Sequence, residues 1–61
     1  MAIYTKQDRN KPGITLVALV DENGSEVIWC AVDIARRKVL ARQAGISTAE
    51  TLERIGYRKA S

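Results

Sequence analysis

The sequence predicts an α+β fold, with an antiparallel sheet of two or three strands followed by two helices. Two apolar runs rich in β-branched residues flank an Asn-Gly pair, which is typical of a β-hairpin. After residue 33 the composition changes to Ala, Arg, Leu and Lys, which are good helix formers. A chain of 61 residues makes one small domain, so we expect a single unit over residues 1–61. Its strands would lie in the N-terminal half and its basic helices in the C-terminal half.

The hairpin is expected to consist of strands 14–20 and 26–32. A type I′ turn at Asn23-Gly24 needs positive φ at both central residues, which Gly tolerates freely and Asn better than most residues. A third strand over residues 2–7 has suitable β propensity, and whether it forms is left open.

The register of this hairpin makes both of its faces apolar. A two-residue turn places Val20 opposite Val27, and Leu19 opposite Ile28 on the other face. A sheet with one solvated face alternates apolar and polar residues instead. Because a short helical segment covers only one face, the other is expected to meet a second subunit, a partner protein or the folded-over C-terminus. The expected interface residues are Val17, Leu19, Ile28, Trp29, Cys30 and Val39.

Two helices are expected after the hairpin. Asp33 is suited to cap the N-terminus of a helix over residues 34–44, and Gly45 to end it in a left-handed conformation. The residues from Ser47 to Glu50 match a capping box, which predicts a second helix over residues 48–55. Gly56 would end that helix and leave Tyr57 free to pack on Leu52.

The residue types argue against catalysis. The chain has no histidine, so the usual general base near neutral pH is missing, and no glycine-rich phosphate loop is present. Its one cysteine, Cys30, forms no intrachain disulfide and cannot build a closed zinc site. We therefore expect a protein that is not an enzyme, with no cofactor and no bound metal.

The sequence also predicts a cytoplasmic location. The first residues lack the basic start and apolar run of a signal peptide. No stretch approaches the roughly 18 apolar residues of a membrane span. A free thiol is consistent with a reducing compartment, and no membrane contact is expected.

Charge is divided unevenly along the chain. Residues 1–33 carry three Lys and Arg against five Asp and Glu, whereas residues 34–61 carry seven against two. On the predicted helix over residues 34–44, clustered cations can neutralise phosphates, although a plain solvated helix face explains the cluster somewhat better. The candidate nucleic-acid-binding residues are Arg36, Arg37, Lys38, Arg42, Ser47, Thr48 and Arg54.

The segment Leu40-Ala41-Arg42-Gln43-Ala44-Gly45-Ile46-Ser47 resembles the first helix and turn of helix-turn-helix DNA-binding proteins. That resemblance implies a small residue at Ala41, a glycine at the turn and an apolar residue at Ile46. It also implies that Thr48 opens a recognition helix approaching base edges. The pattern departs in its second half, where Thr51 and Arg54 occupy positions expected to be apolar.

Two functions follow from these observations. The favoured one is a small regulator-like protein that contacts DNA or RNA through a basic helix, as a homodimer that buries the spare sheet face. The alternative is a protein-protein interaction module, such as a phage- or plasmid-encoded inhibitor of a host protein, acting through an apolar sheet face or a strand edge.

Overall fold

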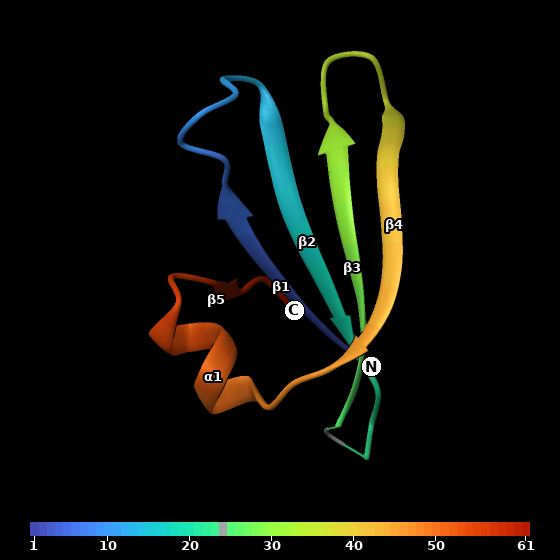
Figure 1. Ribbon diagram of the computed structural model, residues 1–61, viewed down its shortest axis with the longest axis vertical. Helices are drawn as coiled ribbons and strands as arrows, with labels where there is room; N and C mark the ends of the chain where they lie inside the picture. The colour runs from blue at the N-terminus through green and yellow to red at the C-terminus, as the bar shows by residue number, and fades with distance from the viewer. Residues whose placement is uncertain (24) are drawn as a thin grey trace.

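The computed structural model describes residues 1–23 and 25–61, and it shows one antiparallel sheet with a short helix packed on it (Figure 1). The spatial order of the five strands is β4-β3-β2-β1-β5. The elements in chain order are β1 (Ala2–Gln7), β2 (Ile14–Val20), β3 (Glu26–Asp33), β4 (Lys38–Ile46), α1 (Ala49–Arg54) and β5 (Arg58–Lys59).

The predicted hairpin is confirmed, including its register. Val20 lies opposite Val27 and Leu19 opposite Ile28, as expected from a two-residue turn. The expected third strand forms as β1, which pairs antiparallel with β2. The positive φ expected at Asn23 is not found, because Arg37 is the one non-glycine residue with a positive φ among those described, and Gly24 lies outside them. The α+β class with an antiparallel sheet is therefore correct, but the predicted count of two or three strands is wrong.

The predicted helix over residues 34–44 is wrong, and with it the helix-turn-helix resemblance. Residues 34–37 form a turn, and the chain then continues as β4 along the free side of β3. The helix propensity of Ala, Arg, Leu and Lys amounts to a few tenths of a kcal/mol per residue, so tertiary context overrides it. Here that context is β3, which without β4 would leave a row of unpaired backbone groups.

The turn between β3 and β4 uses the residue that was expected to cap a helix. Asp33 Oδ1 accepts a hydrogen bond from the backbone N–H of Arg36 at 3.1 Å. Arg37 has a φ of 52°, in the left-handed region that non-glycine residues adopt at a cost. The prediction that the Asp33 carboxylate accepts a hydrogen bond from a following backbone N–H is therefore correct, but this hydrogen bond closes a turn between two strands and does not start a helix.

A β-bulge interrupts the pairing of β3 with β4. Ala31 lies opposite Ala41 and Val32 opposite Val39, so Leu40 is an extra residue in β4 without a cross-strand partner. Because side chains alternate between faces along a strand, this extra residue changes which face the following positions of β4 occupy.

The short helix α1 forms where the second helix was predicted. Its N-cap is Thr48, whose side chain accepts a hydrogen bond from the Thr51 N–H at 3.1 Å. After the C-cap, Gly56 has a φ of 104°. The Gly56 and Tyr57 N–H groups then donate to the carbonyls of Glu53 and Leu52, which is a Schellman ending. Gly56 and its role were predicted correctly.

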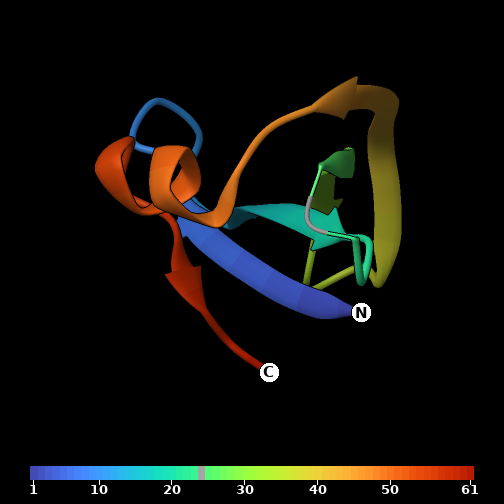
Figure 2. The same cartoon turned by 90° about the horizontal axis from the view of Figure 1, so that it is seen from below.

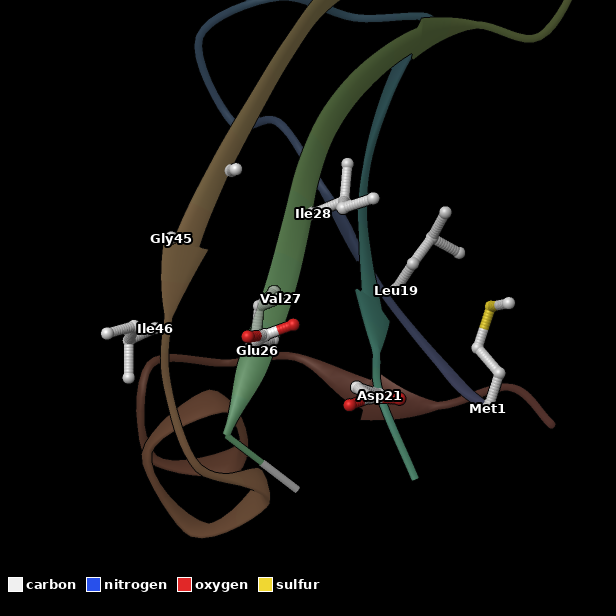
Figure 3. A pocket seen from close by; sticks show the side chains of 9 residues that line it. Met1, Leu19, Asp21, Glu26, Val27, Ile28, Gly45 and Ile46 are labelled. Atoms are coloured by element: carbon white, nitrogen blue, oxygen red, sulfur yellow. The ribbon is translucent and has the colours of Figure 1, made fainter. Parts of the chain in front are cut away.

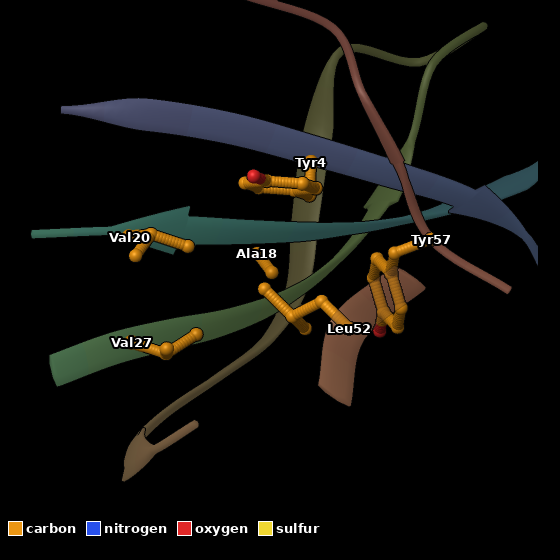
Figure 4. Close-up of a cluster of buried hydrophobic side chains, with 6 residues drawn as sticks. All are labelled: Tyr4, Ala18, Val20, Val27, Leu52 and Tyr57. Carbon is orange, nitrogen blue, oxygen red and sulfur yellow. The ribbon is translucent and has the colours of Figure 1, made fainter. Parts of the chain in front are cut away.

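The hydrophobic core lies between the sheet and the segment that contains α1 (Figure 4). Leu52 reaches the sheet from the helix and is fully buried, and Tyr57 packs beside it at 8% exposure. Trp29 approaches the Tyr57 ring edge-on, with ring centroids 5.8 Å apart. The buried core cluster consists of Tyr4, Ala18, Val20, Val27, Leu52 and Tyr57.

The C-terminal segment crosses from the end of β4 to the opposite edge of the curled sheet, as seen from below (Figure 2). There β5 pairs with β1, and Ile3 exchanges backbone hydrogen bonds with Ala60 and Ser61. Lys6 also ties this segment down, donating from Nζ to the Ile55 carbonyl at 2.6 Å. Within residues 1–23 and 25–61, no helix has the length and apolar character needed to cross a membrane.

Candidate functional site

The candidate site is the face of the sheet opposite α1, which we call the open face. The strand register arranges its side chains in cross-strand rows, each two residues further along the strands. Its members, row by row, are Met1, Asp21, Glu26 and Ile46; Ile3, Leu19, Ile28 and Ala44; Thr5, Val17, Cys30 and Arg42; and Gln7, Thr15, Val32 and Val39.

The second of these rows is entirely apolar and lies beside a hollow in the surface. Leu19 and Ile28 extend from neighbouring strands, with Met1 beside Leu19 (Figure 3). The hollow has a volume of about 690 Å³ and extends to Ala44 and Ile46 of β4. It is lined mainly by carbon, as expected of a surface that binds another apolar surface.

Large apolar side chains on the open face are strongly exposed. Ile46 is 83% exposed, Met1 73% and Val39 57%. Such exposure is normal for one isolated side chain, but here the side chains share one face of one sheet. The open face is therefore an apolar surface that the packing of the described chain leaves uncovered.

The rows on either side of the apolar row carry opposite charge. Asp21 and Glu26 lie in the first row, and Arg42 lies opposite Cys30 in the third row. Glu26 and Arg42 are both exposed. Within residues 1–23 and 25–61, neither side chain has an ion-pair partner.

The structure brings together five of the six residues predicted for an interface. Val17, Leu19, Ile28 and Cys30 lie on the open face, and Val39 joins them opposite Val32. The sixth, Trp29, lies on the covered face, because it sits opposite Ala18 and contacts Tyr57. Trp29 therefore belongs to the core side of the sheet.

The predicted nucleic-acid-binding residues do not share a helix. Arg36 and Arg37 lie in the β3–β4 turn, where the Arg36 guanidinium is 3.9 Å from the Asp33 carboxylate. Lys38 lies opposite Asp33 on one face of the sheet, whereas Arg42 lies on the other face. The bulge at Leu40 separates them, so these two cations cannot act as the helical pair that was expected.

The other three predicted nucleic-acid-binding residues are engaged in local structure. Ser47 donates from Oγ to the Thr48 carbonyl, and its N–H donates to the Ser25 carbonyl. Thr48 is the N-cap of α1. Arg54 Nη2 is 3.4 Å from Glu50 Oε1, one helical turn away.

Sequence reasoning missed the β4 part of the open face, namely Arg42 as a sheet residue together with Ala44 and Ile46. A signal for it was present in residues 27–32, which are apolar on both faces, as is typical of a central strand. A central strand needs a neighbour on each side. That requirement favoured a further strand after β3 over a helix.

Tyr57 is a titratable group on the covered face. Burial raises the pKa of the Tyr57 hydroxyl above its ordinary value, and this ring packs against Trp29. On the open face, Cys30 is a half-buried free thiol that lies between Val17 and Arg42. Among the described residues, no three His, Cys, Asp or Glu side chains are grouped to hold a metal ion.

No protein family, curated protein or solved structure that was compared with the chain matches it.

Proposed function

We propose that the protein is a non-enzymatic interaction module that binds another protein chain through its open face. The observation that supports this most directly is the apolar row Ile3, Leu19, Ile28 and Ala44, which continues to the exposed Ile46. A sheet packs such a face against a second layer about 10 Å away. In this chain α1 supplies that layer on the covered face only.

The exposed apolar area of the open face favours binding. Burying a fully exposed Leu or Ile side chain contributes about 1.5–3 kcal/mol, so Ile46 contributes most, whereas Leu19 and Ile28 contribute less because they are already partly buried. Interfaces of this kind combine an apolar centre with a charged rim. Here Leu19 and Ile28 would form the centre, and Asp21, Glu26 and Arg42 the rim.

Site-specific photo-crosslinking tests this proposal. A benzoylphenylalanine at position 7 replaces the exposed Gln7 at the margin of the open face, and the matched control carries it at Glu53 on α1. We expect a covalent protein adduct from position 7 and none from position 53. The adduct should disappear when Ile28→Lys places a charge at the centre of the face. Equal adducts from both positions, or an adduct that survives Ile28→Lys, would exclude the proposal.

A second candidate function is binding of nucleic acid at one end of the sheet. The β1–β2 loop and the β3–β4 turn lie at the same end (Figure 1). Together these connections and the first residue of β4 carry five cations, against Asp8 and Asp33. The cations are Arg9, Lys11, Arg36, Arg37 and Lys38. Exposed cations of this number bind a phosphate backbone without reading its sequence.

Salt-dependent binding distinguishes this second function. A labelled single-stranded or duplex oligonucleotide should bind with an affinity that falls steeply as salt rises. Arg36→Glu with Arg37→Glu should reduce both the affinity and the salt slope, whereas Arg54→Glu on α1 should leave them unchanged. Equal binding by all three proteins would exclude a role for this end of the sheet.

A further inference from the structure

We propose that the chain bound to the open face is a second copy of this protein, with the strands of the two copies running in opposite directions. Glu26 of each copy would then lie against Arg42 of the other. This inference rests on the proposed function, because it names the partner of the same face.

Charge on the open face follows a fixed order along the strands. The row with Asp21 and Glu26 comes first, then the apolar row with Leu19 and Ile28, and then the row with Arg42. Neighbouring rows are about 7 Å apart, since each strand residue adds about 3.3 Å. Acid and base therefore lie at similar distances on either side of the apolar row.

A two-fold axis that lies along the apolar row, perpendicular to the strands, makes the two copies complementary in charge. The axis reverses the strand direction and keeps β4 of one copy facing β4 of the other. The row of Glu26 in one copy then lies opposite the row of Arg42 in the second copy. Because a two-fold interface repeats each contact, this charge pair forms twice. Leu19 and Ile28 meet their own copies at the centre.

The other face-to-face arrangement is disfavoured by the same charges. A two-fold axis parallel to the strands places every row opposite itself, so Asp21 and Glu26 of both copies would be brought together. Like charges brought together at an interface cost several kcal/mol, which removes this arrangement. The charge order on the open face therefore selects antiparallel packing of the copies.

Glu26 and Arg42 are suited to pair between chains because they are not used within one. Within residues 1–23 and 25–61, the ion pairs join Met1 to Glu22, Asp33 to Arg36 and Glu50 to Arg54. Both side chains are exposed, so pairing them across an interface breaks no contact that stabilises the single chain.

Sedimentation equilibrium of charge variants of the full chain tests the proposal. The wild type should be a dimer, and Ile28→Lys should weaken association by more than about a hundredfold, because it buries a charge at the centre. Glu26→Arg and Arg42→Glu should each weaken it by about tenfold, since each creates two like-charge contacts. The double variant Glu26→Arg with Arg42→Glu should recover most of the wild-type affinity. Glu53→Arg on α1 serves as the control and should change nothing.

Each result decides one point. A wild type that stays monomeric at millimolar concentration overturns the inference that the partner is a second copy. In that case, an adduct from position 7 to a different protein would still support the proposed function. A dimer that Ile28→Lys leaves intact overturns the inference, because the copies then meet elsewhere. A dimer lost in both single variants but not recovered in the double variant overturns the antiparallel register. Circular dichroism of every variant shows whether a loss of association comes from unfolding.

Discussion

The two faces of this sheet have similar apolar composition but differ in how far their side chains are buried. On the covered face, Leu52 and Val27 are fully buried and Tyr57 lies against Trp29. On the open face, Leu19 and Ile28 are only partly buried and Ile46 is 83% exposed. The same strands present both sets of side chains. The difference comes from one short segment, residues 47–61, which covers one face and leaves the other uncovered.

This contrast separates the side chains that stabilise the folded chain from those that are available to bind a partner. A side chain on the covered face contributes to the free energy of unfolding of the single chain. A side chain on the open face contributes most once a second surface covers it, because its exposed area is still in water. Substitutions on the covered face should therefore lower the stability of the single chain, and substitutions on the open face should mainly weaken binding.

Leu52→Ala and Leu19→Ala compare the same change on the two faces. Leu52→Ala should lower the free energy of unfolding by about 3 kcal/mol, because it removes a fully buried side chain and leaves a cavity. Leu19→Ala should lower it by only about 1–2 kcal/mol, since Leu19 is partly buried and leaves no enclosed cavity. Urea denaturation at low protein concentration measures both, so that association does not contribute. Equal losses would show that the open face stabilises the chain as much as the core does.

Gly45→Ala tests the close packing of β4 on the covered face. A Cβ at Gly45 would lie 2.7 Å from Trp29 Nε1, so the indole must move. We expect a loss of about 2 kcal/mol, within the range for overpacking a well-packed site. Trp29 is the single tryptophan, so its emission maximum reports the movement directly. Ala44→Gly, one position away on the open face, is the matched control and should leave the emission unchanged.

Thr48→Ala tests the N-cap of α1, which lies in the segment of residues 47–61 that covers one face of the sheet. The Thr48 side chain accepts from the Thr51 N–H, and its removal should lower stability by about 1 kcal/mol. Thr48→Ser keeps the oxygen and should retain most of the stability. Thermal unfolding measures both variants. Equal stability of Thr48→Ala and wild type would mean that the cap does not help to hold α1 on the sheet.

High pH should lower the free energy of unfolding through Tyr57, and this is the smallest of the expected effects. Burial raises the pKa of Tyr57 above its ordinary value of 10.0, so the folded chain holds the hydroxyl proton more tightly than the unfolded chain. The resulting stability is complete below pH 10 and is lost as pH rises toward the raised pKa. Tyr57→Phe should show a smaller loss over that range. Denaturation at a series of pH values compares the two proteins, and parallel curves would contradict this assignment.

Local signals made the hairpin and the short helix predictable. The Asn-Gly pair and its flanking apolar runs were enough to predict the register of β2 with β3. Gly56 followed by Tyr57 was enough to predict where α1 ends. β4 was not predictable in this way, because Ala41, Arg42 and Gln43 favour a helix locally. What turns this segment into a strand is the unpaired side of β3, a contact made by tertiary structure.

The candidate site was predictable in part for the same reason. Leu19, Ile28 and Cys30 followed from the hairpin register alone. Arg42 was assigned to a helix face, so its position beside Cys30 was missed. Trp29 was grouped with the interface residues because the register does not reveal which face the C-terminal segment covers. That choice depends on where Leu52 and Tyr57 dock.

The bulge at Leu40 has a consequence for solubility. β4 is the outermost strand on its side of the sheet, and a long outer strand is a template on which further chains can stack without limit. The bulge breaks the regular spacing of its free backbone groups, and Lys38 and Arg42 place a cation on each side of it. At the opposite edge, β5 has only two residues, too few to serve as a template. Both edges thus resist fibrous aggregation, and assembly is directed to a face where it ends after one partner.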